Sequence, residues 1–192
     1  MIITLEHITP NAEELISKYS AVCYNSDTTD PIKNNKRIKH LMKVKHLSTL
    51  RHAIATFRVE GISRACSHQF VRSKHLDFLQ RSQRYCSEDG FEVVKPEMTV
   101  VQELCFQETI THIHSTYDAL VASGMKKEDA RMVLPNAATT ELIVTGNLQS
   151  WKDFIALRTV PAAQYEIRQV ALGIERVLQA ECPNVFGELN DE

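Results

Sequence analysis

The sequence lacks the residue patterns of membrane, secreted and metal-binding proteins. No apolar run approaches the roughly 18 residues that cross a bilayer, and residues 1–7 lack the basic and apolar segments of a secretory signal. The cysteines are odd in number and never paired at metal-finger spacing, which argues against a disulfide framework and a zinc ribbon. They are Cys23, Cys66, Cys86, Cys105 and Cys182. We expect a soluble, cytoplasmic protein whose cysteines are mostly buried and reduced.

The histidines offer no metal site by spacing. His112 and His114 are expected on one helix, where a two-residue separation places them on different sides, and the other histidines are dispersed. We therefore expect no metal ion.

An excess of positive charge is also missing. The 192-residue chain has 22 Lys and Arg against 24 Asp and Glu, a net charge of −2, so neither a nucleic acid nor a membrane surface is expected as a partner. Positive charge is concentrated locally in residues 69–85, which contain Arg72, Lys74, Arg81 and Arg84 around Ser82. Because arginine grips phosphate through two parallel hydrogen bonds, this cluster favours a pocket for a small phosphate-bearing ligand.

Apolar periodicity and turn residues predict strands separated by helices of unequal length. Strands are expected over residues 1–7, 53–60, 91–95 and 139–145, and helices over 11–20, 65–71, 98–123, 126–134, 148–157 and 161–180. Ser63 is expected to cap a helix, and the basic run 33–37 is expected to be a solvated loop or helix face. Phe70, Trp151 and Phe154 are expected in the core. The pattern indicates one α+β domain spanning residues 1–192.

Separated motifs carry a resemblance in order along the chain. Residues 61–72 read Gly-Ile-Ser-Arg-Ala-Cys-Ser-His-Gln-Phe-Val-Arg, and Arg-Ser-Lys at 72–74 precedes Ser-Gln-Arg-Tyr at 82–85 by seven residues. Further matches are His-Leu-Ser-Thr-Leu from His46, Arg-Met-Val-Leu-Pro-Asn from Arg131, Asn147, and Ala-Leu-Arg ending at Arg158. Together they resemble the flavin-dependent thymidylate synthases, whose signature is Arg-His-Arg, seven residues, then Ser.

The resemblance implies a fold, an activity and an assembly. The fold would be an α+β domain of antiparallel or mixed strands with long helices, assembled as a homotetramer with active sites at subunit interfaces. The activity would be FAD-dependent reductive methylation of dUMP to dTMP, with 5,10-methylenetetrahydrofolate as carbon donor, NADPH as reductant and no cysteine nucleophile. In such chemistry the cofactor performs the difficult step, while the protein orients and polarises the substrate.

The resemblance also assigns site residues. Arg84 and Ser82 would hold the dUMP phosphate, Arg131 would reach the nucleotide from a neighbouring subunit, and Arg158 would be catalytic, stabilising negative charge on the uracil ring. The full dUMP set is Gln69, Arg72, Gln80, Ser82, Gln83, Arg84, Arg131 and Arg158. The FAD set is His46, Ser48, Arg72, Ser73, Lys74, His75, Asn147, Asp153 and Leu157.

The chain departs from the family pattern at several positions. Ser73 and Lys74 replace the signature histidine and second arginine, Gln80 replaces a glutamate, and Arg51 replaces a glutamate before the His-Ala pair. We hypothesise that Arg51 contacts a flavin phosphate or folate, because an acid-to-base change alters anion affinity most. Two alternatives remain: a divergent flavoenzyme acting on another pyrimidine nucleotide, and a non-catalytic nucleotide-binding oligomer. Without the motifs, surface ion pairs would be the ordinary explanation of these arginines.

Overall fold

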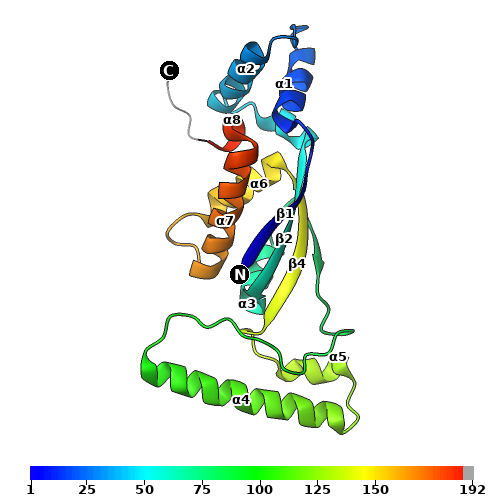
Figure 1. Ribbon diagram of the computed structural model, residues 1–192, viewed down its shortest axis with the longest axis vertical. Coiled ribbons are helices and arrows are strands. Elements are labelled where there is room, and N and C mark those ends of the chain that lie inside the picture. The colour runs from blue at the N-terminus through cyan, green and yellow to red at the C-terminus, as the bar shows by residue number, and fades with distance from the viewer. Residues whose placement is uncertain (188–192) are drawn as a thin grey trace.

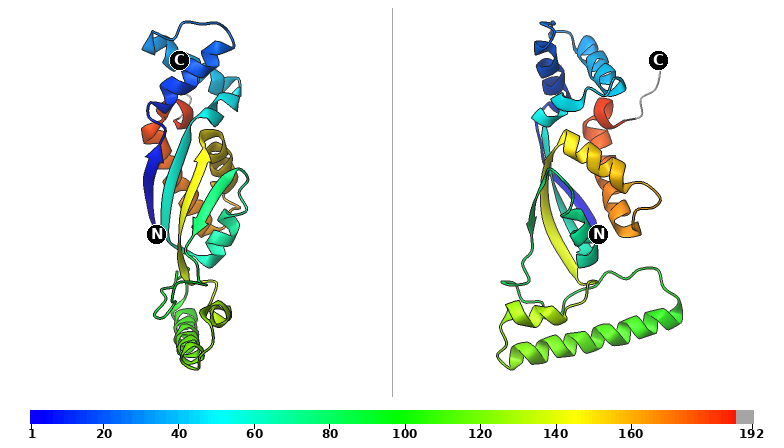
Figure 2. Two further views of the ribbon diagram at one scale, coloured as in Figure 1. Left: turned by 90° about the vertical axis from the view of Figure 1, so that its right-hand side faces the viewer. Right: turned by 180° about the vertical axis from the view of Figure 1, so that it is seen from behind.

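The computed structural model describes residues 1–187 as an α+β structure built on one four-stranded antiparallel sheet (Figure 1). The strands are β1 (Ile2–Ile8), β2 (Ile54–Ser63), β3 (Leu76–Gln80) and β4 (Thr139–Asn147), in the spatial order β1-β2-β4-β3. Helices α3 (Arg64–Phe70), α6 (Leu148–Arg158) and α7 (Tyr165–Glu181) cover one face of the sheet (Figure 2). The predicted α+β class is confirmed, and the strands pair antiparallel.

The core lies between the sheet and these helices because alternate side chains of the central strands point toward them. Phe57 of β2 and Val144 of β4 are fully buried there. Trp151 of α6 packs edge-on against Phe57 at 5.1 Å between ring centroids and donates its indole N–H to the carbonyl of Ala55 at 3.0 Å. The predicted burial of Phe70, Trp151 and Phe154 is confirmed.

Two antiparallel helices lie at one end of the molecule (Figure 1), α1 (Ala12–Val22) and α2 (Pro31–Lys43). Asp30 caps α2 by accepting hydrogen bonds from the backbone N–H groups of residues 32 and 33, and Pro31 occupies the first turn, where its missing N–H costs nothing. Lys33, Asn35 and Lys36 are exposed on α2, whereas Asn34 is buried and Arg37 is half-buried, and both bond to Ser17 of α1. The basic run 33–37 is therefore a solvated helix face only in part. The 3₁₀ helix η1 (Leu47–His52) follows, and α8 (Pro183–Phe186) packs against α2 and α7.

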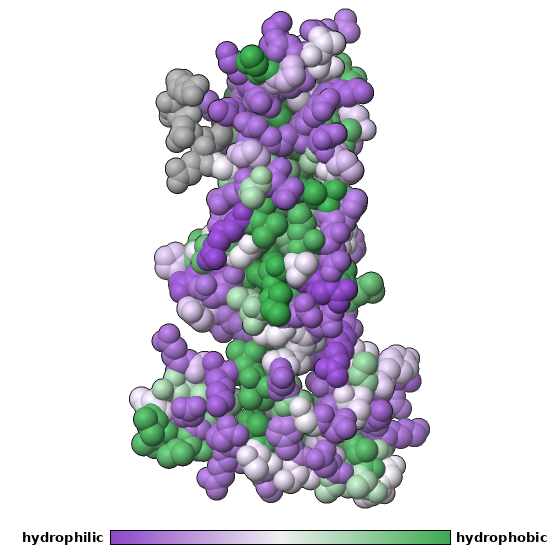
Figure 3. Space-filling model, in the orientation of Figure 1, coloured by the Kyte–Doolittle hydropathy of each residue, from purple (hydrophilic) through white to green (hydrophobic). Residues whose placement is uncertain are grey.

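The other end is formed by the long helix α4 (Val100–Ala122), with α5 (Lys127–Ala130) and the 3₁₀ helix η2 (Arg131–Val133) beside it (Figure 1). Thr99 and Gln102 form a reciprocal capping box at the start of α4. Only Ile110 and Tyr117 of α4 are buried, although its sequence contains many more apolar residues. At its beginning Val100, Val101 and Leu104 are 75%, 77% and 67% exposed, and Figure 3 shows apolar residues gathered there.

Some expected elements are wrong. Residues 91–95 form no strand and make only an isolated bridge between Val93 and Ala138, because Phe91 packs with Ile110 of α4 instead of in a sheet. Strand β3 was not predicted, since apolar and polar residues alternate only weakly over residues 75–81, the seven residues between Lys74 and Ser82. Strand β2 does not end at Gly61 but continues through a bulge, with Gly61 at φ +67°. Helix α7 begins at Tyr165, not at Pro161, because Gln164 caps it.

The expectation for the cysteines is also wrong in part. Cys66 and Cys182 are buried, whereas Cys23 and Cys105 are exposed and Cys86 is half-buried. Cys105 lies on the same exposed part of α4 as Leu104, which explains why a burial prediction from composition fails there. No helix in residues 1–187 combines the length and apolarity needed to cross a membrane.

Candidate active site

Two arginines from distant motifs meet on one glutamate. The Arg84 guanidinium pairs with the Glu128 carboxylate at 2.6 Å, and the Nε of Arg131 donates to the backbone carbonyl of Glu128 at 3.0 Å. The hydroxyl of Ser82 accepts a 3.2 Å hydrogen bond from the backbone N–H of Arg84, which shapes the turn that carries the arginine. The signature loop and η2 are thereby brought together within one chain. Whether Arg131 serves a neighbouring subunit stays a prediction.

A cavity of about 280 Å³ opens beside this pair. It is lined by Arg64 and His68 of α3, by Gln83, and by Arg131, Met132, Leu134, Pro135 and Asn136. Gln83 and Arg131 belong to the predicted dUMP set, and the amide nitrogen of Gln83 is buried without a hydrogen-bond partner in the described residues. Arg64 and His68 were missed, although both fall inside the quoted motif at residues 61–72.

The electrostatics of this cavity favour an anion. The guanidinium groups of Arg64 and Arg131 line it. Those of Arg81 and Arg84 lie outside the lining and pair with the carboxylates of Glu88 and Glu128. Burial lowers the pKa of Arg64, and the positive charges of Arg131 and Arg81 lower it further. Burial also raises the pKa of Glu88, against the attraction of Arg81 and Arg64. Two positive charges remain in excess, which matches a phosphate dianion.

The predicted Gln80 is held between the sheet and α3. Its side-chain amide nitrogen donates to the hydroxyl of Ser67 at 3.0 Å and to that of Thr140 at 3.2 Å. Since a carboxylate cannot donate, the glutamate of the family pattern would have to accept hydrogen bonds from these hydroxyls instead. Gln80 therefore contributes a neutral group where the family pattern has an acid, and this makes its surroundings more positive.

Arg158, the predicted catalytic residue, lies at the other end of α3. Its guanidinium donates to the carbonyl of Gln69 at 3.3 Å, while its Nε is buried with no hydrogen-bond partner in residues 1–187. Helix α3 thus carries Arg64 at its N-terminal end and Gln69 beside Arg158 at its C-terminal end. At 1.5 Å per residue the seven-residue helix spans only about 10 Å, so both groups of arginines lie near one short helix.

The turn between α3 and β3 presents the rest of the signature. Arg72 and Lys74 are exposed and form no hydrogen bond or ion pair within the described residues, and the Ser73 hydroxyl is buried without a partner. His75 adopts a left-handed backbone conformation, φ +62°. This is an uncommon geometry for a non-glycine residue. Four consecutive members of the predicted FAD set are therefore side by side with unused polar groups.

The remaining flavin residues lie on η1 and along α6. The backbone N–H of Leu148 donates to the carbonyl of Ala53 at 2.9 Å, which places the start of α6 beside the end of η1. His46 and Ser48 are exposed at the opposite end, where η1 begins. Asn147 caps α6 by accepting from the Ser150 backbone N–H at 2.9 Å. Further along α6, Asp153 accepts from Gln149 at 2.7 Å, and Leu157, next to Arg158, is 60% exposed.

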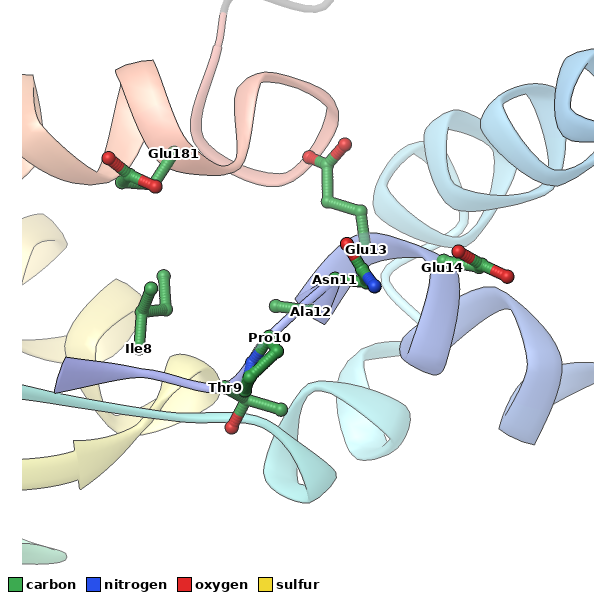
Figure 4. Close-up of a pocket in the computed structure, with 8 residues that line it drawn as sticks. All are labelled: Ile8, Thr9, Pro10, Asn11, Ala12, Glu13, Glu14 and Glu181. Atoms are coloured by element: carbon green, nitrogen blue, oxygen red, sulfur yellow. The ribbon is translucent and has the colours of Figure 1, made fainter.

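The other cavities suit this chemistry less well. One of about 410 Å³ near the start of α1 contains Glu13, Glu14 and Glu181 (Figure 4), whose negative charges repel a phosphate. Glu13 also caps α8 by accepting hydrogen bonds from Asn184 at 2.6 and 2.7 Å. A mainly apolar cavity of about 630 Å³ lies between α3, α4 and the start of α7 and shares Asn136 with the arginine cavity.

Comparison with known proteins identifies the class to which these sites belong. Residues 4–184 match the family described as thymidylate synthase complementing protein. Proteins named flavin-dependent thymidylate synthase are 37% identical in Geobacter sulfurreducens, over 95% of this chain and 83% of that protein, and 35% identical in Mycobacteroides abscessus, over 82% and 70%. The protein of that name in Corynebacterium glutamicum is 34% identical over 94% of this chain and 81% of its own length. The chain therefore belongs to the thymidylate synthase complementing protein family.

Proposed function

We propose that this protein catalyses the FAD-dependent reductive methylation of dUMP to dTMP in the cytoplasm, with 5,10-methylenetetrahydrofolate as carbon donor and NADPH as reductant. The observation that carries the proposal is that Arg84 and Arg131, 47 positions apart in the sequence, are joined through Glu128 beside the cavity that Arg131 and Arg64 line. Its family members are named for this activity. The arginine cavity supports phosphate binding, the property that a nucleotide monophosphate demands of its site.

The proposed roles of the nucleotide residues follow from their contacts. Arg84 and Ser82 bind the phosphate, and the ion pair with Glu128 orients the Arg84 guanidinium until an anion arrives. Gln83 contributes the side-chain nitrogen that has no partner among residues 1–187. Arg131 approaches the same cavity from η2, and in the proposed tetramer it reaches the nucleotide of a neighbouring subunit. Gln69, Arg72 and Gln80 complete the dUMP set along α3 and β3.

Arg158 is proposed to act on the uracil ring. Its guanidinium is half-buried and makes a single long hydrogen bond in the described residues, so most of its donors are available. A cation fixed in a partly desolvated position stabilises the electron-rich, enolate-like form of the ring whose C5 attacks the carbon donor. The C5 hydrogen is then lost as a proton when the new carbon–carbon bond has formed.

No cysteine nucleophile is proposed. Burial raises the pKa of the Cys66 thiol, the cysteine nearest to Arg158, and the negative charge of Glu166 raises it further. Burial raises the pKa of Cys182 to about 12. Because the thiolate is the nucleophilic form, neither buried cysteine is activated.

The residues at the turn after α3 and on α6 fit a bound FAD. Arg72 and Lys74 offer unpaired positive charges for its phosphates, the partnerless Ser73 hydroxyl offers a hydrogen bond, and exposed Leu157 offers an apolar contact. His46, Ser48, His75, Asn147 and Asp153 form the rest of the proposed site. When bound, the flavin supplies the hydride that reduces the transferred one-carbon unit to a methyl group.

We also propose the homotetramer. Val100, Val101 and Leu104 are exposed together at the start of α4, a helix rich in apolar residues. Such patches mark protein interfaces. A second copy packed there would cover them and complete sites to which more than one subunit contributes.

Flavin absorption, dUMP binding and nucleotide methylation assays distinguish the proposed function from the two alternatives. Protein purified without added cofactor is expected to show an oxidised-flavin absorption band, or to acquire one on addition of FAD, and to bind dUMP. A colourless protein that binds dUMP but takes up no FAD would instead be a nucleotide-binding oligomer. Methylation of a modified uridylate but not dUMP would identify the divergent flavoenzyme. Matched assays of dUMP and the modified nucleotide decide between these outcomes.

A further inference from the structure

We propose that Arg64 is an additional phosphate-binding residue of the nucleotide site. The inference rests on the proposed function, since it names a further ligand for the same substrate. Arg64 is not one of the residues to which the family signature assigns a role. Its backbone is fixed by hydrogen bonds, several of its guanidinium N–H groups have no acceptor in the described residues, and other charged side chains lie near it.

The backbone of Arg64 is fixed relative to the cavity. Ser63 caps α3 by accepting the Cys66 N–H at 3.0 Å, and both oxygens of Glu166 bind Ser63, at 2.6 and 2.7 Å. The N–H of Arg64 donates to the carbonyl of Ala138 at 3.0 Å. The chain that precedes Ala138 carries the cavity wall from Arg131 to Asn136. The Cα atom of Arg64 is therefore held in a fixed position relative to the cavity wall.

The guanidinium of Arg64 has more donors than the protein uses. It has five N–H donors, of which one, on Nη2, bonds to the carbonyl of Arg81 at 2.9 Å, and its Nε is buried without a partner in the described residues. The hydrogen bond to Arg81 ties Arg64 to the signature loop just before Ser82. A planar guanidinium that is hydrogen-bonded through one nitrogen and lies beside a cavity can bind a phosphate through its remaining N–H groups.

The charges around Arg64 are mixed, with the attraction of Glu88 ahead of the repulsion from Arg131 and Arg81. Its carboxylate neighbour, Glu88, lies 3.9 Å from Arg81 and makes no hydrogen bond or ion pair with Arg64 among residues 1–187. Arg131 and Arg81 lie close enough to repel its charge. Since like charges are held together only at a cost, a dianion between them removes repulsion as well as adding hydrogen bonds. That is the arrangement of an anion site, and Arg64 contributes the most buried of its guanidinium groups.

The test compares a nucleotide with its nucleoside. Dissociation constants of dUMP and of deoxyuridine, which lacks the phosphate, are measured for the wild type, R64Q and R176Q by titration calorimetry with thermal melting of each protein. Arg176 is exposed on α7 and provides a matched control. We expect R64Q to weaken dUMP binding at least about tenfold, the loss of a hydrogen bond to a charged group, and to leave deoxyuridine binding unchanged. R176Q is expected to bind both as the wild type does.

Several outcomes would overturn the inference. Unchanged dUMP affinity in R64Q would remove Arg64 from the site, and equal losses for dUMP and deoxyuridine would assign it a structural role. Should R64Q fail to fold, R64K keeps the charge but not the fork, and the expected loss is several-fold for dUMP alone. A wild type without affinity for dUMP would refute the proposed function. In that case, the broadening of the ³¹P line of inorganic phosphate by the wild type and by R64Q tests whether Arg64 binds phosphate. Equal broadening by the two proteins would contradict the inference.

Discussion

Replacing Arg158 by alanine is expected to separate catalysis from stability. In the free chain this side chain makes a hydrogen bond of 3.3 Å to the Gln69 carbonyl, longer than the usual 2.7–3.2 Å, and leaves Nε buried and unpaired. The hydrogen bond contributes at most about 1 kcal/mol, and an unpaired buried donor costs about 1–3 kcal/mol. The two effects oppose each other, so the free energy of unfolding is expected to stay level or to rise by about 2 kcal/mol. That is a rise in Tm of no more than about 4–8 °C for a chain of this size.

Turnover is expected to fall much further. Removing a single preorganised donor that stabilises developing negative charge lowers kcat about 10²–10³-fold in enzymes where it has been measured, a barrier increase of about 3–4 kcal/mol. Arg158→Ala is expected to lose activity on this scale while still binding dUMP through the arginine cavity. Arg158→Lys retains the positive charge without the planar guanidinium. Its turnover is expected to lie between those of the wild type and Arg158→Ala.

The assay follows dTMP formation and thermal unfolding of the same preparations. Arg168→Ala is the matched control, because Arg168 is also half-buried and also donates one backbone hydrogen bond, to the Pro161 carbonyl at 3.2 Å, but lies over the Tyr165 ring and outside the candidate site. Its turnover is expected to stay within about twofold of the wild type. Wild-type turnover in Arg158→Ala, or a loss of turnover matched by a collapse in Tm, would refute the catalytic role.

Further predictions concern the cofactor, the buried acid and the assembly. Arg51→Ala is expected to weaken FAD binding several-fold, because Arg51 is exposed beside η1 without a partner in the described residues; unchanged affinity in a flavin titration would remove that contact. Burial raises the pKa of Glu88 above 4.5. A carboxyl that holds its proton more tightly when folded destabilises the protein as pH rises. The wild type should therefore lose stability relative to Glu88→Gln from about pH 4.5 up to the raised pKa, whereas a pH-independent difference in denaturant unfolding would contradict this. Leu104→Asp is expected to dissociate the assembly without unfolding the chain, since Leu104 is 67% exposed; a sedimentation profile identical to wild type would argue against an interface on α4.

The elements with strong local signals were predictable from the sequence. Helix α4 has a capping box and many apolar residues, and β4 is rich in β-branched residues. Strand β3 has neither, and it forms because its five residues pair with β4, a tertiary interaction that no local pattern reports. The strand prediction for residues 91–95 was wrong for the opposite reason. Their composition is that of a strand, but they pack against helix α4 and Ala138.

The candidate site was predictable only as a set of motifs. Arg84 and Arg131 were named from similarity, and the structure adds that Glu128 joins them within one chain. Arg64 lay within the quoted motif, but charge spacing alone could not distinguish it from a surface arginine. Its significance comes from burial, from the neighbouring guanidinium groups of Arg81 and Arg131, and from the cavity, all of which depend on the folded chain.

The most direct measurement uses dUMP carrying tritium at C5. Forming the new carbon–carbon bond at C5 expels its hydrogen, so catalysis transfers tritium from the nucleotide to water while dTMP accumulates. With FAD, NADPH and 5,10-methylenetetrahydrofolate present, we expect one tritium released for each dTMP formed, and neither product when FAD is removed. Stable tritium in dUMP under the complete conditions, with protein that is folded and binds the nucleotide, would contradict the proposed methylation.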